Sequence, residues 1–254
     1  MTRTAVAVIP AHNESDTIAD VVTRTRKHVS KVIVVDDGSS DDTSAKAEAA
    51  GAFVSRLVPN RGKGQALVHG LELAMKDLPF AVVTLDADGE HDPDDVPKLL
   101  AALDTADIAL GVRHTFRSGA RSAMNKLALF WFQLLDPAIE DTICGLRAFR
   151  AEKLPALQND FGGFVYEHEV LIRAVLNGMR MVAVSIQTVP TTSSHVTVEE
   201  VLRANNHFDR RVLQELGSLP LPVWKKGLLA IGCASGLALG VPAEFLVRAR
   251  NKTR

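Results

Sequence analysis

The amino-acid sequence predicts an α/β protein with a single domain, built on a mostly parallel central sheet that helices flank. Over the first hundred residues, short runs of β-branched and apolar residues alternate with longer helical patterns. Polar clusters directly follow three of these runs, at the strand ends where parallel sheets bind their ligands. The chain has 254 residues, of which 46% are hydrophobic and 23% are charged. This size and composition allow one sizeable core.

The first part of the chain contains strand and helix patterns in regular order. Four short apolar runs predict strands over residues 5–9, 32–35, 53–57 and 81–85. The stretches between them predict helices over residues 15–28, 42–50 and 64–76. Strands that alternate with helices at this spacing are typical of a parallel sheet covered on both faces.

The second part of the chain has a less regular pattern. Here the sequence predicts a strand over residues 108–112 and an extended run over residues 181–189. It also predicts helices over residues 124–135, 166–176 and 199–216. No internal repeat or low-complexity tract interrupts the sequence. We therefore expect a main domain over residues 1–222 and a C-terminal appendage over residues 223–254.

Composition and charge narrow the class of function. The formal net charge is −1, so no overall field recruits nucleic acid. The two cysteines, Cys144 and Cys233, lie far apart and in no metal-binding spacing. We expect them to be reduced thiols of an intracellular protein. The apolar run near the N-terminus ends at Pro10, too early for a secretory signal.

The C-terminal appendage contains an apolar segment at residues 227–247 that only Glu244 interrupts. The uninterrupted part before Glu244, residues 227–243, is slightly short of a comfortable bilayer span. Basic residues flank both ends, Trp224 stands where an interfacial aromatic belongs, and glycines recur at every fourth position, at Gly232, Gly236 and Gly240. This pattern favours insertion or embedding in a membrane over a helix in water, where so many glycines are unfavourable.

Residues 85–93, with the sequence LDADGEHDP, carry the strongest chemical signal in the chain. Asp86 and Asp88 stand two apart after a predicted strand, so both carboxylates can approach one point. Two carboxylates this close resist ionisation unless a cation lies between them. A hard divalent ion takes oxygen ligands and bridges readily to a diphosphate. The alternative is a polar turn after a strand, where Asp and Gly are common.

Two further loops add polar groups to the same edge of the predicted sheet. Asp36 begins the run DDGSSDDT at the end of the second predicted strand. A carboxylate in this place can accept a hydrogen bond from a ribose or base, or simply belong to a capped turn. Residues 60–64, NRGKG, form a basic loop before a helix, which suits an anion. The loop lacks the spacing of a P-loop.

Together these segments resemble family 2 of the glycosyltransferases, a large inverting family with a GT-A-type fold. The resemblance rests on IPAHNE at residues 9–14, VDDGS at 35–39, NRGKGQA at 60–66 and DADGEH at 86–91, in the order of the family. It implies that Asp86 and Asp88 hold Mg²⁺ or Mn²⁺ and the diphosphate of a nucleotide sugar. Glu90, where many relatives carry glutamine, is a third candidate metal ligand. The resemblance also implies a donor site formed by Pro10, His12, Glu14, Val34, Asp36, Lys63, Ala87, Arg113 and His195.

The second half resembles the polyprenyl-phosphate branch of that family, which includes the dolichyl-phosphate mannose synthases. Arg117, Arg121 and Asn125 recur at every fourth position, so in a helix they form one polar stripe that suits an anionic acceptor. A solvated helix face is the alternative. Asp141 and the following CGLRAF resemble the acceptor segment of the branch, and Glu167 and Glu169 its acidic helix. Both glutamates can equally be helix-surface acids.

The function that follows is transfer of a hexose from GDP-mannose or UDP-glucose to a polyprenyl phosphate, at the cytoplasmic face of the cell membrane. An acceptor phosphate is already anionic and needs no strong general base. A sugar hydroxyl acceptor would need one, and Asp141 is the candidate. A sugar-nucleotidyltransferase is a weaker alternative, because it should carry a glycine-rich, arginine-containing loop after the first strand. A non-catalytic nucleotide-sugar-binding protein is weaker still, because the acidic residues of the metal site are present.

Overall fold

The structure of the protein is a computed structural model that describes residues 3–113, 129–159, 164–189 and 198–234. Within these residues the strands form one sheet in the order β3-β2-β1-β4-β6-β5-β7. The strands are β1 (Ala5–Ala11), β2 (Lys31–Asp36), β3 (Phe53–Arg56), β4 (Ala81–Thr84), β5 (Ile108–Arg113), β6 (Arg147–Arg150) and β7 (Met181–Ile186). Neighbouring strands are parallel except at β6, which is antiparallel to both β4 and β5. The predicted α/β class with a mostly parallel sheet is confirmed.

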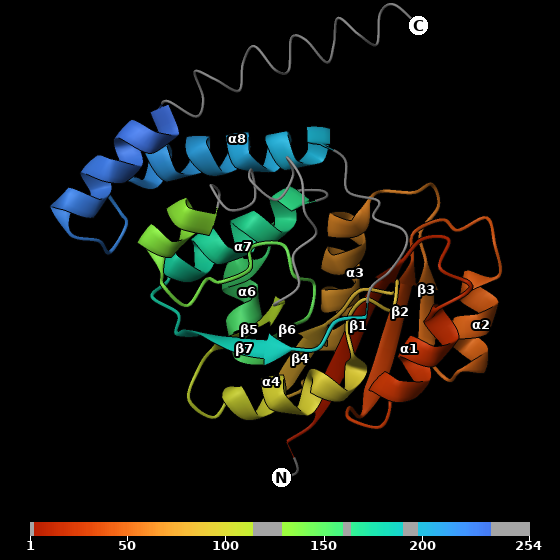
Figure 1. Cartoon of the computed structure of the whole chain (residues 1–254). Helices are drawn as coiled ribbons and strands as arrows, with labels where there is room; N and C mark the ends of the chain where they lie inside the picture. The colour runs from red at the N-terminus through yellow and green to blue at the C-terminus, as the bar shows by residue number, and fades with distance from the viewer. Residues whose placement is uncertain (1–2, 114–128, 160–163, 190–197, 235–254) are drawn as a thin grey trace, which may run out of the picture.

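Helices cover both faces of the sheet (Figure 1). One face carries α1 (Ile18–Thr25), α2 (Thr43–Ala49) and α4 (Val96–Ala102), the last preceded by the 3₁₀ turn η1 (Pro93–Asp95). The other face carries α3 (Lys63–Met75), α6 (Leu154–Leu157) and α7 (Phe164–Leu176), with η2 (Ala151–Lys153) before α6 and α8 (Val198–Glu215) packed on α7.

The alternation of side chains along β1 shows how the sheet divides the core. Ala7 and Ile9 are buried with α1 and α4, whereas Val6 and Val8 are buried on the opposite face with α3. Successive strand residues point to opposite faces, and β1 lies in the middle of the sheet, so all of them must be apolar. The central strands therefore read as continuous apolar runs in the sequence.

The sequence did not predict β6 or α4. Strand β6 has only four residues, of which the first and last are arginines, so it carries no apolar run. The buried Arg147 side chain is satisfied locally, because it donates to the carbonyl oxygens of Cys144, Thr142 and Glu167 at 2.8–3.2 Å. A buried charge with this many partners is tolerated inside a sheet.

The C-terminal appendage is described as far as residue 234, and residues 223–234 form a helix. This helix packs on the main domain: Leu229 and Cys233 are buried in the core, and an added Cβ at Gly232 would lie 2.2 Å from the Trp131 ring. The predicted apolar segment at residues 227–247 therefore lies largely outside the described residues. Among the helices that the structure describes, none has the length and apolar character needed to cross a bilayer.

Candidate active site

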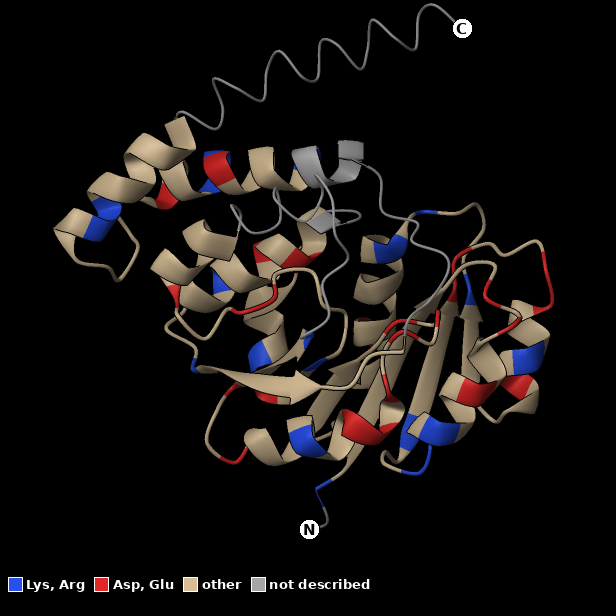
Figure 2. Cartoon of the chain, in the orientation of Figure 1, with Lys and Arg blue, Asp and Glu red and all other residues tan. Residues whose placement is uncertain are grey.

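The loops that follow β1, β2 and β4 meet at one edge of the sheet, as the sequence predicts for parallel strands. The Asn13 amide donates to Ser39 Oγ at 2.9 Å and so joins the first two loops. The Thr17 hydroxyl donates to the carbonyl oxygen of Ala87 at 2.7 Å and so joins the first to the third. Figure 2 shows acidic segments gathered in the loops along this edge. Ala87 thus lies in the site, although its own side chain is buried.

The acidic pair at the end of β2 holds its surrounding loops together. Asp36 is fully buried and accepts hydrogen bonds from the Ser39 amide at 2.7 Å and from the Ser44 hydroxyl. Burial alone would raise the pKa of Asp36, but these hydrogen bonds outweigh it and lower the pKa. Asp37 accepts from the amides of Arg61 and Gly62, both at 2.7 Å. The sequence did not single out Asp37, whose carboxylate fixes the loop before α3.

The residues predicted to bind the nucleoside lie in two different environments. His12 is exposed at the edge of the sheet, and its Nδ1 lies 3.0 Å from the carbonyl oxygen of Asp37. Glu14 is partly exposed in the same loop. Pro10 is buried in β1, and the side chain of Val34 is fully buried in the core. Of these four, His12 and Glu14 are the residues that solvent reaches.

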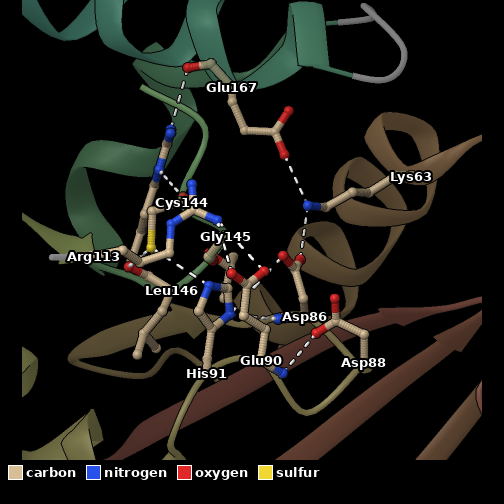
Figure 3. Close-up of polar contacts among 12 residues, drawn as sticks. Lys63, Asp86, Asp88, Glu90, His91, Arg113, Cys144, Gly145, Leu146 and Glu167 are labelled. Atoms are coloured by element: carbon tan, nitrogen blue, oxygen red, sulfur yellow. Dashed lines mark hydrogen bonds and ion pairs between the residues drawn. The ribbon is translucent and has the colours of Figure 1, made fainter. Parts of the chain in front are cut away.

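Asp86 lies at the centre of the site, between Lys63 and Gly145 (Figure 3). Lys63 Nζ is 2.7 Å from Asp86 Oδ1, and the Asp86 side chain is 22% exposed. Burial works to raise the pKa of Asp86, but the Lys63 charge prevails and the pKa falls to about 2. Gly145 is required here, because an added Cβ would lie 2.4 Å from Asp86 Oδ1. The structure thus holds Asp86 ionised and gives it close access to the Gly145 backbone.

Asp88 and Glu90 stand next to Asp86 but differ in their partners. Asp88 Oδ1 accepts from the Glu90 amide at 2.9 Å. Burial and the nearby Asp86 charge raise the pKa of Asp88, as expected for two carboxylates that share a site. The Glu90 carboxylate instead faces Arg113, with Nη1 at 3.5 Å. Within the described ranges, no three or more acidic, histidine or cysteine side chains are grouped as a ready-made metal site.

Arg113 joins the end of β5 to the segment that precedes β6. Its guanidinium forms a two-pronged ion pair with Asp141, with Nε–Oδ2 at 2.8 Å and Nη2–Oδ1 at 3.1 Å. Asp141 Oδ1 also accepts from the amides of Ile143 and Cys144. Burial alone would lower the pKa of Arg113, but the ion pair with Asp141 outweighs burial and raises the pKa. Asp141 is therefore fully engaged in holding Arg113 and the turn before β6.

His91 and Cys144 are buried under the acidic residues. Cys144 Sγ lies 3.6 Å from His91 Nε2, and His91 Nδ1 lies 3.9 Å from Asp86 Oδ2. Burial lowers the pKa of His91 and raises that of Cys144 to about 12, so both are neutral at pH 7. Neither adds a positive charge that would offset the acidic residues. His91 belongs to the acidic run in the sequence, and its burial was not predictable from that position.

Glu167 reaches the site from α7, on the other side of Lys63 (Figure 3). Its side chain is 3% exposed, and Lys63 Nζ lies 3.1 Å from Oε1. Glu169 is buried too, but it faces away and pairs with Arg173, His207 and Arg211. The interpretation of the two as helix-surface acids is therefore wrong, because both side chains are buried. Arg117, Arg121 and His195 lie outside the described residues.

Comparison with known proteins supports the resemblance seen in the sequence. Residues 6–161 match the model of the family described as glycosyl transferase family 2. Polyprenol monophosphomannose synthase from Mycolicibacterium smegmatis is 31% identical, over 73% of this chain and 77% of its own length. Undecaprenyl-phosphate mannosyltransferase from Micrococcus luteus is 30% identical, over 71% of this chain and 82% of its own.

The fold is also found among solved structures. Glucosyl-3-phosphoglycerate synthase from Mycobacterium tuberculosis, in complex with Mn²⁺, uridine diphosphate and phosphoglyceric acid, superimposes with a TM-score of 0.67. The two chains are 24% identical, and the match covers 87% of this chain and 80% of the other. At this identity the likeness establishes the shared GT-A-like architecture.

Proposed function

Because this chain belongs to glycosyl transferase family 2 and is therefore a glycosyltransferase, we propose that it transfers a hexose from a nucleotide sugar to a polyprenyl phosphate. The donor would be GDP-mannose or UDP-glucose, and the transfer would invert the anomeric carbon. We take the acceptor class from the names of the two mannosyl-transferring relatives above, because each name includes a polyprenyl carrier. Residues 1–222 would form the catalytic domain of this enzyme.

The observation that carries the proposal is the acidic pair Asp86 and Asp88 at the end of β4, opposite two cations. Both aspartates supply hard oxygen atoms. Burial and the neighbouring Asp86 charge raise the pKa of Asp88, and a bound cation would offset both effects. Magnesium in particular is commonly held by one or two carboxylates together with substrate phosphates, rather than by a complete protein cage. The residues therefore fit Mg²⁺ or Mn²⁺, which would neutralise charge on the leaving diphosphate.

The residues of the chain supply the rest of the chemistry by charge and position. Lys63 and Arg113 place positive charge beside the acidic pair, where negative charge grows on the leaving group. An acceptor phosphate is already anionic, so alignment with the anomeric carbon is what the site must provide. Asp141 is engaged with Arg113 and two amides, which favours a positioning role over proton abstraction from a hydroxyl acceptor.

A membrane location would bring the enzyme to a lipid-linked acceptor. The helix at residues 223–234 supports this proposal because several apolar side chains on it are exposed. Trp224 is 62% exposed and Ile231 is 72% exposed, with Val223 and Leu228 beside them in the sequence. Lys225 and Lys226 stand at the start of the helix, where they suit an anionic lipid surface. We propose the cytoplasmic face of the cell membrane.

The test is direct transfer of labelled sugar. Purified protein is incubated with a polyprenyl phosphate and with labelled GDP-mannose or UDP-glucose, in Mg²⁺, in Mn²⁺ and in EDTA. The proposal expects a lipid-linked sugar with one donor, which disappears in EDTA. No lipid-linked product with any nucleotide sugar, while a water-soluble acceptor is glycosylated, would show that the acceptor class is wrong.

A further inference from the structure

The Lys63 ammonium links two carboxylates that differ in access. Asp86 is 22% exposed and lies on the open side of the site, whereas Glu167 is 3% exposed and lies on α7. A ligand cation can therefore reach Asp86 but not Glu167. Lys63 itself stands at the first position of α3, after Gly62, whose φ of 85° turns the chain into the helix. The Lys63 ammonium thus extends into the site from the first residue of α3.

The backbone of Glu167 is held in place by the buried side chain of Arg147. Arg147 Nη1 donates to the Glu167 carbonyl at 3.2 Å, and the same guanidinium donates to the carbonyl oxygens of Cys144 and Thr142. This one buried side chain therefore ties the beginning of α7 to the segment that carries Gly145 against Asp86. Glu167 Oε2 has no hydrogen-bond partner among the described residues. A buried carboxylate with spare acceptor capacity binds a nearby ammonium strongly.

We propose that Glu167 is a positioning residue that holds Lys63 when a divalent cation binds to Asp86. A divalent ion on Asp86 repels the ammonium, which lies 2.7 Å from Oδ1. Glu167 lies beyond the reach of that ion and keeps Lys63 beside the site, where its charge faces the diphosphate of the donor. Without Glu167, the ammonium would remain on Asp86 and compete with the ion. The inference rests on the proposed metal and donor site, and not on the nature of the acceptor.

The first experiment measures Mn²⁺ affinity in the presence of UDP or GDP, whichever the unaltered protein binds. Titration is followed by paramagnetic resonance of the free ion, without acceptor or turnover. Glu167→Gln should weaken Mn²⁺ binding about tenfold, as expected for a coupling of ordinary size. In a Lys63→Met background the same substitution should change Mn²⁺ affinity by less than about twofold, because the competing ammonium is gone. Equal effects in both backgrounds would mean that Glu167 acts only through its charge, and would overturn the proposal.

Glu169→Gln is the matched control. Glu169 stands two residues away on α7 and is equally buried, but it pairs with Arg173, His207 and Arg211 and not with Lys63. It should lower the melting temperature and leave Mn²⁺ affinity unchanged. A loss of Mn²⁺ affinity in this variant equal to that in Glu167→Gln would show that disturbance of α7 is sufficient, and would contradict the specific role.

The second experiment needs no substitution. A crystal structure of the unaltered protein with Mn²⁺ and UDP should show Lys63 Nζ within hydrogen-bond distance of Glu167 and no longer in contact with Asp86. Retention of the Asp86 contact, or loss of the Glu167 contact, would overturn the proposal. If the unaltered protein binds Mn²⁺ with neither UDP nor GDP, the proposed function itself fails. Binding with no coupling between Lys63 and Glu167 would instead refute this inference alone.

Discussion

The acidic pairs at the ends of β2 and β4 occupy equivalent places in the sheet but have opposite surroundings. Asp36 and Asp37 accept hydrogen bonds from backbone amides and a serine hydroxyl, which fix the loops around them. Asp86 and Asp88 have fewer such donors and stand close enough to repel each other. The comparison teaches that an acidic pair after a strand builds structure where amides surround it, and leaves charge available for a ligand where they do not.

The largest effect should come from removing the charge of the second pair. The double variant Asp86→Asn with Asp88→Asn should lower the transfer rate about 10³-fold, because a bound metal contributes several kcal/mol of transition-state stabilisation. Its unfolding free energy should change little, because the loss of the Lys63–Asp86 ion pair offsets the removed cost of burying Asp88 beside Asp86. Steady-state kinetics and urea unfolding measure the two. A fully active double variant would refute the proposed role of the pair.

The next largest effect should follow from displacing Asp86 without changing its charge. In Gly145→Ala, the added methyl group would lie 2.4 Å from Asp86 Oδ1, so the carboxylate must move. We expect a loss of activity of about 10²-fold, since a displacement of about 1 Å can have this effect. Gly217→Ala is the control, because nothing lies within 4 Å of an added Cβ there. Equal kcat/KM for the two variants would mean that the position of Asp86 is unimportant.

Removing a carboxylate from the pair Asp36 and Asp37 should lower the unfolding free energy more than the transfer rate. Asp37→Ala removes the carboxylate that accepts from the amides of Arg61 and Gly62, of which the Gly62 amide keeps Asn60 Oδ1 as a second acceptor at 3.0 Å. The loss of unfolding free energy should be about 1–3 kcal/mol, the usual range for hydrogen bonds to a charged group. Urea unfolding measures it, and Asp77→Ala, at an exposed ion pair with Lys31, serves as the control. If Asp37→Ala were as stable as the parent, the structural role of the first pair would be refuted.

The smallest effect, and the most diagnostic, is in the pH dependence of stability without metal. Asp36 has a lowered pKa because its hydrogen bonds outweigh burial, so it stabilises the fold above about pH 4 and less as the pH falls. Asp88 has a raised pKa from burial and from Asp86, so its cost is absent below about pH 4 and appears as the pH rises. Asp36→Asn should therefore be less stable than the parent at pH 7, and Asp88→Asn more stable.

Urea unfolding at pH 7 and at pH 4 in EDTA measures these differences. The Asp88→Asn difference should shrink at pH 4, because the raised pKa of Asp88 leaves it largely protonated there. The Asp36→Asn difference should persist at pH 4 and shrink only at lower pH, because the lowered pKa of Asp36 keeps it ionised. If Asp36→Asn and Asp88→Asn changed the unfolding free energy at pH 7 in the same direction, the proposed difference between the two acidic pairs would be refuted.

The sequence predicted the parts of this molecule that depend on local pattern. The central strands were found because they are buried on both faces, and the polar clusters were placed correctly because parallel strands end at the same edge. Strand β6 was missed because its arginines conceal it, and Arg147 is buried only through partners that come from distant segments. The role of Glu167 was beyond local pattern for the same reason. Its neighbour Lys63 is 104 residues earlier in the chain, and only packing of α7 against α3 brings them together.

The reversed direction of β6 has a consequence for how this enzyme can diversify. Strand β5 finishes at the same edge where β6 starts, since Leu110 and Thr84 are both opposite Arg147. Both ends of the connection between these strands therefore lie at the active-site edge of the sheet. A change in the length of this connection would leave both strand ends and their register in place. The reversed strand thus lets the chain beside the acidic pairs vary without displacing the strands that carry them.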